Sequence, residues 1–318
     1  MASDRRVGVI GIGSLGREHA RIYSDTDGVS SISLYDRIPE RALETAEKYG
    51  AETSESIEEL LDASDLVSIC TPATHHYETA MSAFDRGVHA LIEKPIASTS
   101  REGEEMVRAA ADKGCILQVG HIERFNGAFQ AVAPLLGEPK FIEMHRLGTY
   151  TPRGTDVSVV VDLMIHDIDL VLALLPKDEL VELRASGTGV LTDSIDIVNA
   201  RLAFSGGCVA NITASRISRE PMRKIRFFQE NLYVSVDLRR RKVEAFERSD
   251  QFDASDPASA IRQLDIQVDD GEPLRKEIES FMRAVREGGE PEVNGEAGLR
   301  ALQVAEEILE NIETDRRD

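Results

Sequence analysis

The chain has 318 residues, of which 42% are hydrophobic and 30% charged, so it can bury the cores of one large or two medium domains. Its formal net charge of −20 argues against nucleic acids and anionic membranes as partners, and no apolar run is long enough to span a membrane. Three widely spaced cysteines without metal-ligand spacing, and a start that runs straight into an apolar strand pattern, predict a cytoplasmic protein with no metal site.

The first elements of the chain predict a dinucleotide-binding βαβ unit. An apolar run over residues 7–10 leads into a G-x-G-x-x-G turn, and a second apolar run ends at Asp36, about twenty residues later. Gly11 permits the tight turn, Gly13 lets the backbone approach a pyrophosphate, and Gly16 lets the following helix pack close to the strand. An ordinary glycine-rich turn is the alternative, but it would not explain the strand, the helix and the acid together.

The residues around this turn favour NAD as the cofactor. Asp36 would accept hydrogen bonds from the adenosine ribose and repel a 2′-phosphate, which makes NADP the less favoured cofactor. Arg37 leaves NADP open, because a guanidinium can stack on adenine or pair with that phosphate. Ser14 and Leu15 begin the helix whose N-terminus would face the pyrophosphate.

Strand and helix patterns alternate as far as residue 120. We expect strands at 7–10, 31–36, 66–70, 90–92 and 116–120, and helices at 15–24, 41–49, 56–61, 76–85 and 100–113. This alternation predicts an α/β Rossmann domain, a doubly wound parallel sheet whose ligands bind at the carboxyl ends of its strands.

Two turns at this edge carry further candidate residues. Thr71, Pro72 and His76 follow one strand and are expected beside the cofactor, and the two adjacent histidines there lack a third metal ligand. Glu93 and Lys94 follow the next strand, and we expect both to contact the cofactor. With only 8 lysines against 29 arginines in the chain, a lysine at the ligand-binding edge is expected to be functional rather than a surface residue.

The pattern changes after about residue 125. Strands are predicted at 140–150, 181–190, 195–204, 208–215, 224–229, 232–237 and 242–247, and helices at 273–287 and 297–313. Consecutive strands joined by short turns predict an α+β domain with a large, open-faced, mainly antiparallel sheet. We therefore divide the chain into a Rossmann domain of residues 1–124 and a substrate-binding and oligomerisation domain of residues 125–318, whose C-terminal helix is free to pack back on the first.

The segment from Val159 to Leu170 is the second candidate for function. In a helix, Asp162, His166 and Asp169 would share one stripe about 60° wide on an otherwise apolar surface. A solvated face with Asp162 as a first-turn acid is the alternative, but it explains a histidine and two acids on so apolar a helix poorly.

Two residues between the domains are candidates for substrate binding, His121 and Arg124. The Arg124 guanidinium suits a phosphate or a carboxylate, and a hinge salt bridge with a nearby acid is an equal alternative.

These motifs together resemble the glucose–fructose oxidoreductase/inositol dehydrogenase (Gfo/Idh/MocA) family. The resemblance rests on the N-terminal fingerprint, Thr71-Pro72 with His76, Glu93-Lys94-Pro95, the Asp162…His166…Asp169 series and the C-terminal stretch 295–302. One departure is Met164, which stands where the family often has the glycine of Asp-x-Gly-x-His. The stretches 119–126 and 162–169 look like the branch that oxidises UDP-N-acetylglucosamine at C3.

The resemblance implies an NAD-dependent enzyme that oxidises a secondary hydroxyl of a sugar or nucleotide sugar, and a homodimer or homotetramer built through the open sheet. We expect His166 to act as the base, oriented by Asp162, and Lys94 to hold the developing alkoxide; the reverse assignment of base remains open. These three residues would contact the substrate together with His121 and Arg124. A nucleotide sugar would also suit other arginines of the second domain: Arg146, Arg153, Arg216 and Arg219.

Three alternatives remain open from the sequence. The enzyme could oxidise a free sugar or myo-inositol, it could recycle a tightly held NADP, or the chain could be a non-catalytic dinucleotide sensor. A sensor needs only the fingerprint, so Lys94 and the Asp162–His166 pair favour an enzyme. The acidic composition suits a halophilic source and an acidic mesophile equally.

Overall fold

The structure, a computed structural model, describes residues 4–150, 157–249, 255 and 260–315. The chain forms two compact units. The first comprises residues 1–122 and 272–302, and the second residues 123–271 and 303–318. No helix among the described residues combines the length and the apolar character needed to cross a bilayer.

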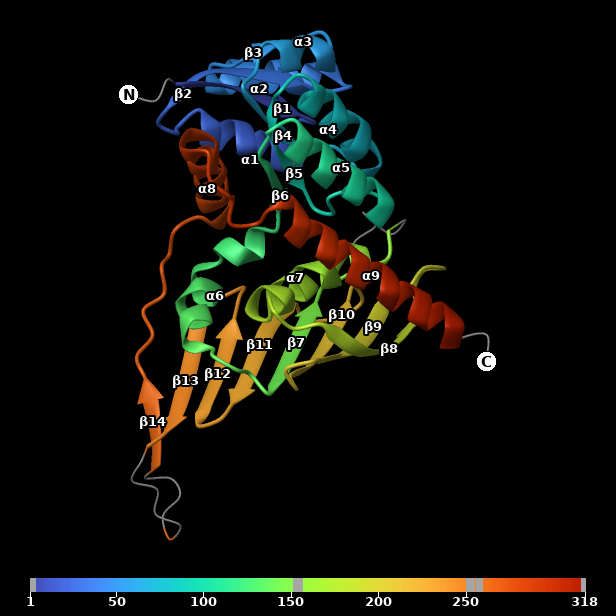
Figure 1. The fold of residues 1–318 in the computed structure, drawn as a ribbon, viewed down its shortest axis with the longest axis vertical. Coiled ribbons are helices and arrows are strands. Elements are labelled where there is room, and N and C mark those ends of the chain that lie inside the picture. The colour runs from blue at the N-terminus through green and yellow to red at the C-terminus, as the bar shows by residue number, and fades with distance from the viewer. Residues whose placement is uncertain (1–3, 151–156, 250–254, 256–259, 316–318) are drawn as a thin grey trace. The chain divides into compact units, whose positions relative to one another are not determined.

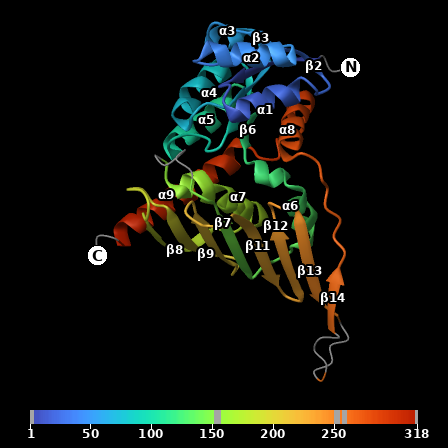
Figure 2. The same ribbon diagram turned by 180° about the vertical axis from the view of Figure 1, so that it is seen from behind.

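The first unit contains a six-stranded parallel sheet in the order β3-β2-β1-β4-β5-β6, with helices on both faces (Figures 1 and 2). This confirms the predicted Rossmann architecture. Its strands are β1 (Arg5–Ile10), β2 (Val29–Tyr35), β3 (Glu52–Thr53), β4 (Leu66–Ile69), β5 (His89–Glu93) and β6 (Leu117–Gly120). Its helices are α1 (Ser14–Tyr23), α2 (Pro39–Tyr49), α3 (Ile57–Asp62), α4 (His76–Asp85), α5 (Ser100–Asp112) and α8 (Pro273–Glu287), together with the start of α9 (Gly295–Asp315).

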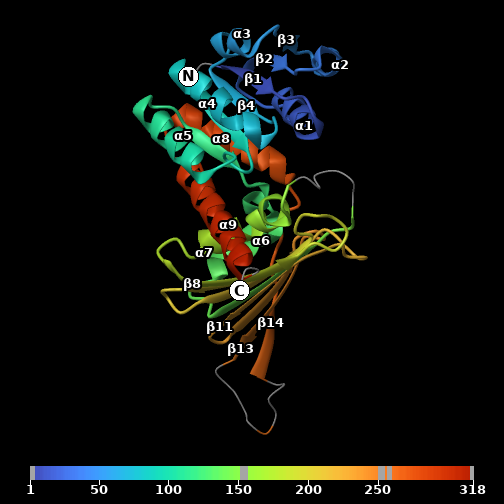
Figure 3. The ribbon, with the colours of Figure 1, turned by 90° about the vertical axis from the view of Figure 1, so that its right-hand side faces the viewer.

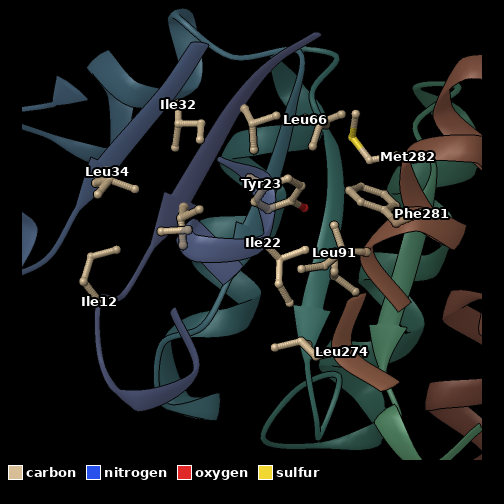
Figure 4. Packing of buried hydrophobic residues seen from close by; sticks show 14 of the residues in the cluster. Ile12, Ile22, Tyr23, Ile32, Leu34, Leu66, Leu91, Leu274, Phe281 and Met282 are labelled. Carbon is tan, nitrogen blue, oxygen red and sulfur yellow. The ribbon is translucent and has the colours of Figure 1, made fainter. Parts of the chain in front are cut away.

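The core of this unit includes residues far apart in the sequence. Figure 4 shows Tyr23 of α1 and Leu91 of β5 beside Phe281 and Met282 of α8, and all four belong to one buried apolar cluster. Because α8 buries its apolar face here, residues 272–302 belong to the first unit. The sequence-based boundary at 124/125 placed them in the second domain.

The second unit contains an eight-stranded sheet in the order β14-β13-β12-β11-β7-β10-β9-β8. Its pairs are antiparallel except β7 with β10, which confirms the predicted, mainly antiparallel sheet. Its strands are β7 (Phe141–Leu147), β8 (Leu180–Thr188), β9 (Ile197–Phe204), β10 (Val209–Ser215), β11 (Met222–Gln229), β12 (Leu232–Asp237), β13 (Lys242–Arg248) and β14 (Ile261–Leu264).

The two faces of this sheet differ. Alternate residues such as Ile142 and Met144 are buried beneath α6 (Gly127–Val132) and α7 (Ile165–Leu174), which lie on one side of the sheet (Figure 3). Among the described residues of this unit, no helix covers the opposite face. There, four aromatic rings follow one another across adjacent strands with centroids 5.7, 5.2 and 6.2 Å apart: Phe141, Phe228, Tyr233 and Phe246.

Candidate active site

The loop after β1 has the geometry that binding of a pyrophosphate requires. Gly11 has a φ of +89°, and a Cβ there would lie 2.9 Å from the backbone of Cys70 and Thr71. A Cβ on Gly16 would lie 1.9 Å from the carbonyl oxygen of Gly11, so α1 can pack this closely only with glycine at that position. Around Gly13, the N-cap of α1, no described atom lies within 4 Å of where a Cβ would be. The loop is therefore closely packed at Gly11 and Gly16 and open at Gly13.

A pocket of about 600 Å³ opens beside this loop. The Thr71 hydroxyl in its wall is buried and has no hydrogen-bond partner among the described residues, so a bound polar group would satisfy it. Ser14 and Leu15 are exposed in the first turn of α1. The open loop and the unsatisfied Thr71 hydroxyl fit a dinucleotide. The lining includes these residues predicted to bind the cofactor: Gly11, Gly13, Asp36, Arg37, Thr71 and Pro72.

Asp36 is held at the pocket by the backbone. Its Oδ2 accepts a hydrogen bond of 2.7 Å from the Ile12 N–H, and its Oδ1 accepts one of 2.8 Å from the Ile38 N–H. The Arg41 guanidinium lies 3.9 Å from Oδ1. Each carboxylate oxygen has a second lone pair, so the aligned carboxylate can still accept from a ribose diol. Arg37 is exposed at the rim of the same pocket.

The Lys94 turn, residues Glu93–Pro95, follows the carboxyl end of β5. Lys94 is half-buried and Glu93 is buried. His76, a predicted cofactor ligand, does not line the pocket: its ring is buried, with Nδ1 2.9 Å from the Pro95 carbonyl oxygen and Nε2 2.8 Å from that of Thr71. Burial lowers the pKa of His76, and the two backbone carbonyls oppose this shift because they accept from the ring. The structure thus places His76 behind the pocket wall, because both ring nitrogens face backbone carbonyls.

In the second unit, the helix that carries Asp162 and His166 begins as a π-helix. Residues Val160–Met164 form a π turn in which the Ile165 N–H donates to the Val160 carbonyl, and α7 continues from Ile165. The regular α-helical stripe expected from the sequence is therefore interrupted between Asp162 and His166. Both side chains are half-buried. Single π turns within helices occur frequently at functional sites.

Buried ion pairs hold α7 against the sheet. The Arg146 guanidinium, on β7, donates to Asp167 at 2.7 Å and to Glu123 at 2.9 Å, and all three side chains are buried. Burial raises the pKa of Glu123, but the positive charges of Arg146 and then Arg223 lower it by more. The net shift is downward, and the carboxylate is ionised. Arg146 therefore has a structural role, because it ties Glu123 and α7 to β7.

Arg124 has the same kind of role. Its Nε and Nη2 atoms donate to the two oxygens of Asp169 at 2.7 and 2.8 Å, and Asp169 is 1% exposed. The hinge salt bridge considered from the sequence is thus present, and both Arg124 and Asp169 support α7.

The remaining candidates for substrate binding differ in exposure. His121, at the end of β6, is buried, and the buried Arg216 donates to the Val157 carbonyl. Arg219 is exposed. Arg153 lies outside the described residues. Lys94 belongs to the first unit, whereas Asp162 and His166 belong to the second.

Comparisons with known proteins agree with both units. The family profile described as an oxidoreductase family with an NAD-binding Rossmann fold matches residues 5–121, and the profile of its C-terminal α/β domain matches residues 136–317. UDP-N-acetylglucosamine 3-dehydrogenase of Acidithiobacillus ferrooxidans is 36% identical over 309 residues, covering 97% of each chain. A solved structure of that enzyme superposes with a TM-score of 0.90 at 34% identity, over 98% of each chain. Inositol 2-dehydrogenase of Rhizobium meliloti is 25% identical over 344 residues, covering 98% of each chain.

Proposed function

Because the chain belongs to the Gfo/Idh/MocA oxidoreductase family, we propose that it is an NAD-dependent dehydrogenase that oxidises the C3 hydroxyl of a UDP-N-acetylhexosamine. One observation carries the choice of substrate: the similarity to the UDP-N-acetylglucosamine 3-dehydrogenase extends over nearly the whole of both chains. The substrate-binding unit is included in that match, and not the common nucleotide-binding fold alone.

The choice of NAD rests on Asp36. Its carboxylate lies in the pocket, aligned by two backbone N–H groups, and would receive a ribose diol while repelling a 2′-phosphate. The Arg41 guanidinium, 3.9 Å from Oδ1, weakens this repulsion only in part, because its side chain is exposed and solvent screens the pair.

The bound nicotinamide would supply the hydride acceptor, and the chain would handle the proton of the hydroxyl. We assign His166 as the base that removes this proton, with Asp162 orienting it. The Lys94 ammonium would hold the same oxygen and stabilise its developing negative charge. The reverse assignment, with Lys94 as the base, is the alternative.

Two other functions follow from specific observations. The similarity to an inositol 2-dehydrogenase supports a free polyol as substrate, but at lower identity. A non-catalytic dinucleotide sensor would need the pocket alone, and would not need Lys94, Asp162 and His166.

We also propose that the uncovered sheet face builds a homodimer or homotetramer. The row of aromatic side chains on β7, β11, β12 and β13 supports this, since Phe228 is 37% exposed in the single chain. Sedimentation of the purified protein tests this, with a monomer as the contradicting result.

The substrate is tested by NAD reduction at 340 nm in low and high salt. UDP-N-acetylglucosamine, free N-acetylglucosamine, glucose and myo-inositol are compared, each with a 2-oxo acid or aminotransferase trap to draw off the ketone. Turnover with the UDP-sugar alone is the expected result. Turnover with a free polyol alone would contradict the proposed substrate and keep the dehydrogenase, and NADH binding without turnover on any compound would favour the sensor.

A further inference from the structure

Two buried histidines contact the two residues that flank Lys94 in the chain. His19, in α1, places its Nε2 3.1 Å from Oε1 of Glu93, and His76, in α4, places its Nδ1 2.9 Å from the carbonyl oxygen of Pro95. Both imidazoles are 0% exposed. The two neighbours of Lys94 in the chain are therefore each tied to a histidine, and the histidines belong to different helices.

The His19 contact belongs to a chain of hydrogen bonds with one consistent direction. The Tyr23 hydroxyl lies 2.9 Å from Ser68 Oγ, which lies 3.0 Å from Nδ1 of His19. A carboxylate only accepts, so the Nε2–H of His19 donates to Glu93; in the tautomer with its proton on Nε2, Nδ1 accepts from the Ser68 hydroxyl. Tyr23 then donates to Ser68; burial raises the pKa of Tyr23, so it keeps its proton.

The Glu93 carboxylate lies against the end of β6. A Cβ on Gly120 would lie 3.0 Å from Oε2 of Glu93, so the carboxylate fits there because position 120 has no side chain. The Cys70 thiol completes a group whose donor atoms all lie within 4.8 Å of one another. Burial, and then the charge of Glu93, raises the pKa of Cys70, so the thiol keeps its proton.

The ring of His76 contacts two segments of the chain. Its Nδ1 faces Pro95 in the Lys94 turn, whereas its Nε2 faces the carbonyl of Thr71 in the wall of the cofactor pocket. Each ring nitrogen can therefore be tested separately, since asparagine places its amide near the position of Nδ1 and glutamine places it near that of Nε2.

We propose that His19 and His76 are positioning residues that fix the Lys94 turn from both sides. The inference rests on the proposed function, in which Lys94 holds the substrate hydroxyl. A misplacement of about 1 Å in a group that contacts the reacting atoms can cost about a hundredfold in rate, so two buried anchors on one turn have a clear use.

The test compares asparagine and glutamine at each histidine. His19→Gln keeps a donor for Glu93, and His19→Asn does not; His76→Asn keeps the partner of Pro95, and His76→Gln keeps only that of Thr71. For the four full-length variants, kcat with the UDP-sugar, KM for NAD and the melting temperature are measured. Ser68→Ala serves as a control that removes a contact of His19 but leaves its bond to Glu93.

We expect the ranking of the glutamine and asparagine variants by kcat to be opposite at positions 19 and 76. At position 19, the glutamine variant should retain most of kcat and the asparagine variant should lose about tenfold or more. At position 76, the asparagine variant should retain kcat and show a raised KM for NAD, and the glutamine variant should lose kcat with KM nearly unchanged. The same order at both positions, or kcat values that simply follow the melting temperatures, would overturn the proposal.

A second measurement separates this inference from the proposed function. The rate at which a small amine-selective reagent labels Lys94 is followed by peptide mass spectrometry, with Lys113 as the internal reference. Faster labelling in His19→Asn and His76→Gln than in their partner variants is expected even if the wild type oxidises none of the sugars, in which case only the proposed function fails. Equal labelling in all four variants would overturn the positioning role.

Discussion

The two units hold their candidate site residues by different physical means. In the first unit, glycine geometry and hydrogen bonds from backbone N–H groups and histidine side chains shape the cofactor pocket and the Lys94 turn. In the second unit, buried ion pairs from Arg146 and Arg124 hold the helix that carries Asp162 and His166. The comparison indicates that the first half depends on backbone shape, and the second on charges brought together from separate elements of the chain.

The largest effect on stability is expected from breaking the ion pairs of the second unit. Arg146→Met would leave Glu123 and Asp167 buried without their main partner, which should lower the free energy of unfolding by about 3–5 kcal/mol. Arg226→Met breaks a more exposed ion pair, between Arg226 of β11 and Glu143 of β7, and should lower the free energy of unfolding by about 1 kcal/mol or less. Urea unfolding of both variants measures the difference, and equal losses would contradict the account.

This difference between the units explains what the sequence could predict. The strand and helix order, the fingerprint and Asp36 were all predictable, because glycine spacing and apolar runs reflect local backbone demands. The pairing of Arg124 with Asp169 depends on how residues 122–125 meet α7, and that of Arg146 with Asp167 on how β7 meets α7, which no local pattern shows. For the same reason, both arginines were taken from the sequence as candidates for substrate binding.

Related reasons explain why the sequence predicted neither the π turn nor the core in which α8 packs. The reading of residues 159–170 assumed 100° per residue, and a single wider turn leaves no signal in hydrophobic periodicity. The amphipathic pattern of α8 predicted a helix, but it did not show which core that helix completes. The buried position of His76 could not be read either, because its partners are backbone carbonyls.

The next largest effect on stability is expected from substitutions of glycines in the first unit. Gly16→Ala would place a methyl group 1.9 Å from the Gly11 carbonyl oxygen and should cost about 2–4 kcal/mol of stability. Gly13→Ala meets no described atom within 4 Å, so it should leave the melting temperature nearly unchanged while weakening NADH binding at the pyrophosphate. Calorimetric unfolding and NADH titration distinguish these outcomes; strong NADH binding by Gly13→Ala would place the pyrophosphate elsewhere.

A smaller effect is expected on cofactor choice. Asp36→Asn removes the negative charge that would repel a 2′-phosphate, so affinity for NADPH should rise about tenfold relative to NADH. Adding Arg41→Ala should reverse part of that gain, since Arg41 lies 3.9 Å from the carboxylate. Isothermal titration of both cofactors measures the ratio, and a ratio unaffected by either change would remove Asp36 from the ribose site.

The smallest effect concerns the pH dependence of stability. Asp196 accepts hydrogen bonds from three consecutive backbone N–H groups and the Thr192 hydroxyl; burial raises its pKa, but these bonds lower it well below its usual range. A depressed carboxyl pKa stabilises the fold above the unfolded-state value of about 3.9, and this stabilisation is lost as the pH falls below it. Urea unfolding of Asp196→Asn should therefore change less between pH 6 and pH 3 than that of the wild type. Asp193→Asn, an exposed change in the same loop, should keep the wild-type slope.

The central proposal is that Lys94 and His166 both handle the hydroxyl that is oxidised, and Lys94→Ala and His166→Ala test it most directly. For each variant, kcat with the UDP-sugar is measured beside the Kd for NADH. The account predicts that both variants lose about 10²- to 10⁴-fold in kcat, because each group handles the reacting hydroxyl, while the Kd for NADH stays close to that of the wild type. Wild-type turnover in both variants would contradict it.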